Sequence, residues 1–174
     1  MSFSHSTIFK IITAGDGAVG KTTLLRRYVE GKFIFNSQMT LGVEIFTKRI
    51  KHKDEIVMLQ LWDFGGQEQF RFMLSSYMLG ARGAIIMFDL TRYVTVNSID
   101  EWVKICRSAN PNLPLILIGG KADLVKDIMV SDDIVLEIKK KYNFIEYLKT
   151  SAKTGDNVDK AFEILVKKIS EMVG

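Results

Sequence analysis

Residues 8–22 read Ile-Phe-Lys-Ile-Ile-Thr-Ala-Gly-Asp-Gly-Ala-Val-Gly-Lys-Thr, an apolar run that passes directly into a glycine-rich loop. Residues 15–22, here called the phosphate loop, fit the pattern G-x-x-x-x-G-K-[ST], whose glycines let successive backbone N–H groups point at phosphate oxygens. The following stretch, Thr22–Glu30, has the periodicity of an amphipathic helix. A helix that begins there adds partial positive charge at the loop. The sequence therefore predicts a strand, a phosphate-binding loop and a helix, in that order.

The rest of the chain alternates short apolar runs with amphipathic segments, which is typical of an α/β domain. Further strands are expected at Val43–Lys51, Glu55–Asp63, Ala84–Asp89, Leu115–Gly119 and Phe144–Thr150. Further helices are expected at Ser98–Ala109, Ser131–Tyr142 and Val158–Met172. The turn at residues 52–54 is too short for a crossover, so the two strands that it joins should be antiparallel. We predict a mostly parallel six-stranded sheet with one antiparallel strand and helices on both faces.

Composition and length indicate one globular domain. The 174 residues fit a single core, and 47% apolar with 25% charged residues is ordinary for a globular protein. We expect a polar N-terminal extension over residues 1–7 and one domain over residues 8–174. The net charge of +4 is mild, and no aromatic–basic patch supports nucleic-acid binding. The single cysteine, Cys106, excludes an intrachain disulfide and is expected to be a buried thiol in an apolar helical stripe.

A second motif, Asp63-Phe64-Gly65-Gly66-Gln67-Glu68, follows an apolar strand. An aspartate there can hold Mg²⁺ through water, Gly66 can offer its N–H to a γ-phosphate, and Gln67 can orient an attacking water. Taken alone, the string fits a polar strand end before a flexible loop equally well. Its position after a phosphate loop favours the catalytic interpretation.

Two short motifs follow the later strands. Lys121-Ala122-Asp123 offers a carboxylate that can accept hydrogen bonds from N1–H and N2–H₂ of guanine, which adenine cannot supply. A site built on such bonds discriminates strongly, because the wrong base leaves a buried carboxylate unpaired. Ser151-Ala152-Lys153 can present its backbone to the base oxygen. Each string is weak alone, but their order and spacing together indicate a guanine-nucleotide site.

In this order and spacing, the motifs resemble those of the Ras superfamily of small GTPases, from about Ile8 to Met172. The Rab-like branch is the most similar, through its switch II pattern of Trp62-Asp63, Gly66-Gln67-Glu68, Phe70-Arg71, Ser75-Ser76-Tyr77 and Gly80-Ala81. The resemblance implies a P-loop NTPase G domain that binds GTP or GDP with Mg²⁺. It further implies slow intrinsic hydrolysis of GTP to GDP and phosphate, and nucleotide-dependent switch loops that recruit partner proteins.

The resemblance also implies roles for particular residues. Thr40 matches a threonine that binds Mg²⁺ and senses the γ-phosphate, and Phe33 matches an aromatic that packs against the base. The expected catalytic residues are Gln67 and Lys21, and the expected Mg²⁺ ligands are Thr22, Thr40 and Asp63. The expected nucleotide contacts are Gly15, Asp16, Gly17, Ala18, Val19, Gly20, Lys21, Thr22, Thr23, Phe33, Thr40, Gly66, Lys121, Asp123, Leu124, Ser151, Ala152 and Lys153.

The sequence departs from the family pattern at two informative positions. Gly120 stands where the family has Asn or Thr, a side chain that usually braces the base-binding loop against the phosphate loop. We therefore expect weaker nucleotide binding and faster exchange, and slower release when Gly120 is replaced by Asn. Ile45 replaces a phenylalanine of the aromatic triad that Rab effectors read, of which Trp62 and Tyr77 match the other two members.

The resemblance implies a GTPase-activating protein, an exchange factor and effectors, expected to bind through residues 33–46 and 64–77. We expect a monomer in the cytoplasm, with no nucleic-acid partner. Membrane association stays open, because the printed chain ends Glu171-Met172-Val173-Gly174 without a cysteine for lipidation. Peripheral attachment would need a C-terminal tail that has been removed. Two alternative functions remain at this stage: a GTP-binding signalling scaffold with little or no hydrolysis, and a P-loop kinase or ATPase.

Overall fold

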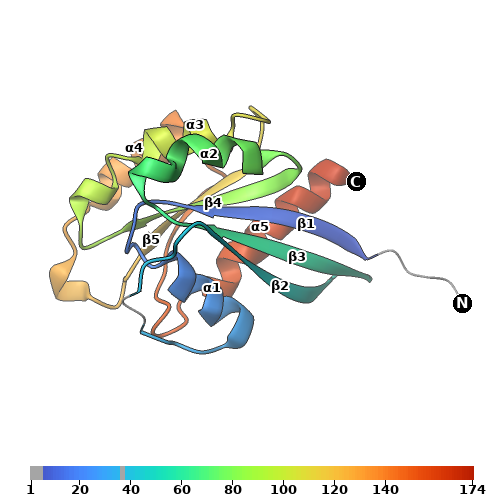
Figure 1. The fold of residues 1–174 in the computed structure, drawn as a ribbon. Helices are drawn as coiled ribbons and strands as arrows, with labels where there is room; N and C mark the ends of the chain where they lie inside the picture. Colours follow the sequence, from blue (N-terminus) through green and yellow to red (C-terminus); the bar gives the residue numbers. More distant parts are fainter. Residues whose placement is uncertain (1–5, 36–37) are drawn as a thin grey trace, which may run out of the picture.

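The computed structural model describes residues 6–35 and 38–174, and in this part of the chain six strands form one sheet in the order β2-β3-β1-β4-β5-β6 (Figure 1). The strands are Thr7–Ala14 (β1), Val43–His52 (β2), Glu55–Phe64 (β3), Ala81–Asp89 (β4), Leu115–Gly120 (β5) and Glu146–Lys149 (β6). Strand β2 pairs antiparallel with β3, and the other neighbouring strands are parallel. The predicted mostly parallel sheet with one antiparallel strand is confirmed.

The helices cover both faces of this sheet (Figure 1). Helices α1 (Lys21–Glu30) and α5 (Val158–Val173) lie on one face. Helices α2 (Arg71–Leu74), α3 (Ile99–Cys106) and α4 (Asp132–Lys141) lie on the other. Short 3₁₀ turns occur at Glu68–Phe70 (η1), Ser75–Met78 (η2), Tyr93–Thr95 (η3) and Val125–Asp127 (η4). Helix α2 is absent from the helices predicted from the sequence, because four residues are too few to show helical periodicity.

Most predicted boundaries differ from the observed ones by a few residues. Strand β4 begins at Ala81, three residues before the expected start. Strand β6 is shorter than the predicted Phe144–Thr150, yet the flanking residues still bond to β5. Ile145 donates its N–H to the carbonyl of Leu115 and Thr150 donates to Gly119. The chain therefore follows the sheet edge from Ile145 to Thr150, nearly the whole predicted length.

Because the central strands are parallel, both of their faces are buried. Along β4, Ile85 and Met87 belong to the core under α1 and α5, while Ile86 and Phe88 belong to the core under α3 and α4. This explains why the run reads as continuously apolar rather than alternating. The two cores fix the carboxyl ends of β1, β3, β4 and β5 at one edge of the sheet.

The single cysteine is buried, as predicted. Cys106 ends α3 and is 1% exposed. Burial raises the pKa of its thiol to about 12, so the thiol stays protonated at neutral pH. Across the part of the chain that the structure describes, no helix has both the length and the apolar character needed to cross a bilayer.

Two aromatic rings join α1 to α5. Tyr28 and Phe162 stack with centroids 3.7 Å apart and ring planes within 7° of parallel, and Phe162 is fully buried. The Phe162→Ala variant should lose about 3–5 kcal/mol of unfolding free energy, since truncation of a buried aromatic leaves a cavity. Denaturant unfolding would measure this. Phe72→Ala, which truncates an 80% exposed ring, should change it by less than about 0.5 kcal/mol. Equal losses in both variants would contradict the conclusion that the buried Phe162 ring stabilises the fold more than an exposed ring does.

Candidate functional site

A cavity of about 560 Å³ opens at the carboxyl-terminal edge of the sheet. This is where ligands bind in parallel α/β sheets. The expected site residues that line it are residues 17–23, Phe33, Thr40, Gly66, Gln67, Lys121, Asp123, Leu124, Ala152 and Lys153. Among the described residues, the expected ones outside this lining are Gly15, Asp16, Asp63 and Ser151. The fold thus brings together motifs that lie more than a hundred residues apart in the sequence.

Two positions of the phosphate loop require glycine, because their backbone has positive φ and, at Gly15, because a side chain would overlap β4. Gly15 has φ of +145° and Gly20 has φ of +104°, both unfavourable for L side chains. A Cβ on Gly15 would lie 2.2 Å from the carbonyl oxygen of Met87 on β4. The loop therefore packs directly on the sheet, and its residues from Gly17 onward line the cavity.

The ammonium group of Lys21 lies inside the curled phosphate loop. Its Nζ donates to the backbone carbonyls of Gly15 and Asp16, both at 2.8 Å. Burial lowers the pKa of Lys21 to about 8, while the carboxylates of Asp63 and Asp16 act in the opposite direction. The protonated form therefore still dominates at neutral pH, and a cation faces the cavity.

Three oxygen-bearing side chains converge beside this lysine. The hydroxyl of Thr22 lies 2.7 Å from that of Thr40 and 2.5 Å from Oδ2 of Asp63. Asp63 is fully buried, which raises the pKa of its carboxyl group, while the Thr22 hydrogen bond and Lys21 lower it. Its other oxygen, Oδ1, has no hydrogen-bond partner in the described part of the chain.

This donor set fits Mg²⁺. Magnesium takes oxygen ligands and is held through one or two carboxylates together with substrate phosphates, rather than by an all-protein cage. No group of three His, Cys, Asp or Glu side chains gathers anywhere in residues 6–35 and 38–174.

The loop after β3 closely approaches the phosphate loop. A Cβ on Gly66 would lie 2.3 Å from the backbone nitrogen of Gly17, so only glycine fits. The next residue, Gln67, lines the cavity, and its side-chain oxygen Oε1 has no hydrogen-bond partner among the described residues. That amide is available to a ligand or a water in the cavity.

The other end of the cavity is formed by the residues after β5 and β6. Lys121 Nζ lies 2.8 Å from a carboxylate oxygen of Asp89 and donates to the carbonyl of Ala18 at 3.1 Å. The hydroxyl of Ser151 donates to Oδ1 of Asp123 at 2.8 Å. Ser151 is 1% exposed, so the structure places it behind Asp123, where it orients that carboxylate.

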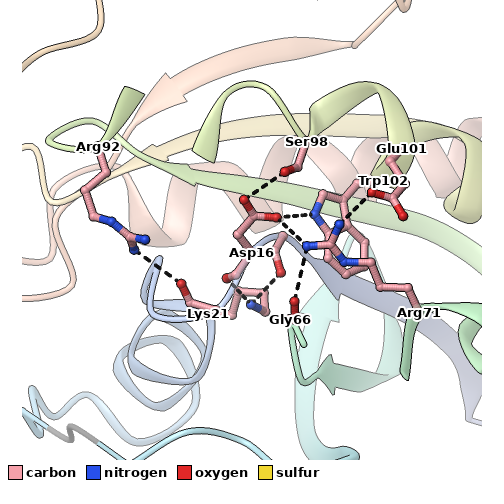
Figure 2. Close-up of polar contacts among 10 residues, drawn as sticks. Asp16, Lys21, Gly66, Arg71, Arg92, Ser98, Glu101 and Trp102 are labelled. Atoms are coloured by element: carbon pink, nitrogen blue, oxygen red, sulfur yellow. Dashed lines mark hydrogen bonds and ion pairs between the residues drawn. The ribbon is translucent and has the colours of Figure 1, made fainter. Parts of the chain in front are cut away.

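The carboxylate of Asp16 points toward Ser98 and Trp102 at α3 (Figure 2), and Asp16 does not line the cavity. It accepts hydrogen bonds at 2.9 Å from the hydroxyl of Ser98, from the indole N–H of Trp102 and from Nη2 of Arg71. We expected Asp16 to contact the ligand, but its backbone carbonyl binds Lys21 while its side chain supports the loop from behind. Ser98 makes no side-chain capping bond at the start of α3, because its hydroxyl is committed to Asp16.

Arg71 is the residue of this network that sequence reasoning missed. Its Nη1 lies 2.5 Å from Glu101, its Nη2 lies 3.3 Å from the carbonyl of Gly66, and its guanidinium lies 4.6 Å from the ring centroid of Trp102 (Figure 2). The side chain is 13% exposed. Arg71 thus joins the loop after β3 to the phosphate loop and to α3. Its charged partners, Glu101 and Asp16, lie too far along the chain for spacing to reveal them.

A second arginine approaches the phosphate loop from the loop after β4. Nη1 of Arg92 lies 3.3 Å from the backbone carbonyl of Gly17 (Figure 2). Arg92 is exposed and was not among the expected site residues. This hydrogen bond joins the loop after β4 to the phosphate loop at Gly17.

Comparison with known proteins gives consistent matches. Residues 10–171 match the family model described as the Ras family. The chain is 40% identical to the Ras-related protein Rab-2B of Dictyostelium discoideum, over 97% of this chain and 83% of that protein. It is 38% identical to RABA6a of Arabidopsis thaliana, over 95% of this chain and 71% of that protein. It is 35% identical to YPT3 of Nicotiana plumbaginifolia, over 97% and 78%.

The Arg71 contacts generate a prediction about mobility. Arg71→Ala removes two charge-assisted hydrogen bonds, to Asp16 and Glu101, each worth roughly 1.5–3 kcal/mol, so residues 66–74 should open at least about tenfold more often. Hydrogen–deuterium exchange would measure this. Arg82→Ala, which removes an exposed arginine on β4, should leave exchange in this segment unchanged. Unchanged exchange in Arg71→Ala would show that the network does not hold the loop.

Proposed function

Because the chain belongs to the Ras family and is a Rab-like small GTPase, a switch that binds and hydrolyses GTP, we propose that the cavity described above is its guanine-nucleotide site. The observation that carries this proposal is the convergence of the phosphate loop, Gln67 and Asp123 around one cavity. Hydrolysis of a phosphoanhydride to give GDP and phosphate is the family's reaction. The comparisons offer no support for a scaffold without hydrolysis or for an ATP-dependent enzyme.

At the phosphate end, the backbone N–H groups of residues 17–23 bind phosphate oxygens, and Lys21 adds a fixed positive charge. Thr22 and Thr40 would hold Mg²⁺ directly and Asp63 through a water. The ion would supply positive charge that neutralises the charge developing on the phosphates. The contacts of Thr22 with Thr40 and with Oδ2 of Asp63, beside an Oδ1 that has no hydrogen-bond partner among the described residues, support this assignment.

At the base end, Asp123 accepts the guanine hydrogen bonds and is held in place by Ser151. The alkyl chain of Lys121 covers one side of the base, Phe33 packs against it, and Ala152 offers its N–H to the base oxygen. Thr23, Leu124 and Lys153 complete the wall. All but Ser151 line the cavity, which supports these roles.

Hydrolysis depends mainly on positioning and charge stabilisation. Gln67 orients the attacking water, and Lys21 stabilises charge on the phosphates. The short approach of Gly66 to Gly17 supports a role for Gly66 as a sensor, since its N–H can reach a γ-phosphate held by the phosphate loop. Loss of that phosphate would release the loop after β3, which is how such switches change state.

Partner proteins are expected to bind the surface formed by residues 33–46 and 64–77, of which residues 36–37 lie outside the described part of the chain. Large apolar side chains there face solvent: Phe35 is 85% exposed, Phe72 is 80% exposed and Leu41 is 74% exposed. Exposed apolar surface of this extent marks interaction sites. We infer that an activating protein, an exchange factor and effectors use this surface. A monomeric state and peripheral membrane attachment stay predictions.

Asp123 provides a test of base choice. The purified protein should bind GDP far more tightly than ADP, and Asp123→Ala should reduce GDP affinity about 100-fold or more, because the guanine donors lose their acceptor. Competition against a fluorescent nucleotide would measure both. Asp127→Ala removes an exposed carboxylate four residues away and should bind GDP normally. Equal affinity of the wild type for ADP would overturn the proposed site.

Gln67 provides a test of hydrolysis. Gln67→Leu should retain GTP binding and lower single-turnover hydrolysis at least about tenfold, because the water loses the group that orients it. Phosphate release from preloaded protein would measure the rate. Gln69→Leu makes the same change at an exposed neighbour and should hydrolyse GTP at the wild-type rate. Normal hydrolysis in Gln67→Leu would remove this residue from the mechanism.

A further inference from the structure

Met87, near the end of β4, lies against three glycines from separate parts of the proposed nucleotide site. A Cβ on Gly15 would lie 2.2 Å from its carbonyl oxygen. A Cβ on Gly20 would lie 3.4 Å from its terminal methyl carbon, and a Cβ on Gly120 would lie 2.3 Å from that same carbon. Met87 is 3% exposed, and what it does expose lines the cavity. Its methyl group therefore fills the space between the phosphate loop and the residue before Lys121.

The backbone does not require glycine at position 120. Gly120 is the last residue of β5, and its φ lies outside the left-handed region that favours glycine. Its hydrogen-bonding partner is also ordinary, since its carbonyl accepts from the N–H of Leu90. A side chain at position 120 would instead meet the methyl group of Met87, which would have to move, and the carbonyl of Val19 at 3.3 Å. The glycine and the methionine are therefore spatially complementary.

We propose that Met87 is a positioning residue for nucleotide retention. Its side chain belongs to the same buried core as Val19 of the phosphate loop, and its methyl group lies between Gly20, at the start of α1, and Gly120, which precedes the base loop at residues 121–124. This inference rests on the proposed nucleotide site, in which the two loops hold the two ends of one ligand. The polar link between them is the exposed hydrogen bond from Lys121 to Ala18. Van der Waals packing of Met87 is the buried link, and it fixes the distance between the loops.

This packing changes the expectation for Gly120. The sequence comparison suggested a missing brace, so that asparagine at this position would slow nucleotide release. The structure shows that a Cβ at position 120 would overlap the terminal methyl of Met87, which is the end of a flexible side chain, so any side chain there requires that methyl to move. Gly120→Asn alone must displace Met87. A side chain at position 120 should help retention only when residue 87 is shortened.

The first experiment measures release of a fluorescent GDP analogue from Met87→Ala. We expect release about tenfold faster than in the wild type, because the loops lose their buried contact. Single-turnover hydrolysis of preloaded GTP should stay within about twofold, since Gln67 and Thr22 are untouched. Ile85→Ala is the matched control: it truncates a fully buried side chain on the same strand and in the same core, outside the cavity lining. It should lower the melting temperature yet leave release unchanged.

A double-mutant cycle with Gly120→Ala tests the contact itself and keeps the inference testable if Met87→Ala fails to fold. In Gly120→Ala alone, the new Cβ would overlap the methyl group of Met87 and displace it, so GDP release should be faster. In the Met87→Ala background the same carbon has room, so the double variant should release GDP no faster than the faster single variant. Rates that multiply in the double variant would overturn the proposal, as would wild-type release in both single variants.

The outcomes separate this inference from the proposed site. If the wild-type protein bound no labelled GDP, the nucleotide-site assignment itself would fail. If the wild type bound GDP and Ile85→Ala changed release as much as Met87→Ala, Met87 would have only a general structural role. Faster release confined to Met87→Ala and Gly120→Ala supports Met87 as the link between the two loops.

Discussion

The structure depends on close approach of backbone to backbone around one cavity. Gly15 lies against the carbonyl of Met87, and Gly66 lies against the nitrogen of Gly17, at separations that no Cβ could tolerate. These contacts bring the phosphate loop and the loop after β3 together at the cavity, where we propose that backbone N–H groups bind an anionic ligand. The burial of Lys21 follows from the same geometry, because its ammonium replaces water as the partner of the loop carbonyls.

A second constraint is the charge at Asp16. A carboxylate this close to the cavity would repel a phosphate if it pointed inward, yet here it points toward α3 and accepts three hydrogen bonds. Its compensating cation is Arg71, which stacks over Trp102 and also contacts the carbonyl of Gly66. The loop that would sense the γ-phosphate is therefore tied to α3 through one guanidinium. If the loop after β3 moves relative to α3, the contacts of the Arg71 guanidinium must change.

The fold and most of the site could be predicted because their signals are local. Alternating apolar runs and helical periodicity identified the strands and all helices except α2, and glycine-rich or charged motifs at strand ends identified the cavity walls. Parallel strands then bring those motifs to one edge of the sheet. The short helix α2 and its flanking 3₁₀ turns escaped prediction, because they are held by contacts such as Arg71 with Glu101 rather than by their own periodicity.

The sequence by itself determined the family, the chemistry of the phosphate loop and the choice of Asp123 as the candidate base-reading group, because each is a pattern of neighbouring residues. Only the tertiary structure decided that Asp16 faces α3, that Ser151 supports Asp123 and that Met87 occupies the space beside Gly120. These relations join residues 28 to 86 positions apart, or place a side chain of one strand over a glycine of the neighbouring strand. Which atoms fill a shared space depends on how both cores pack, and no local pattern encodes that.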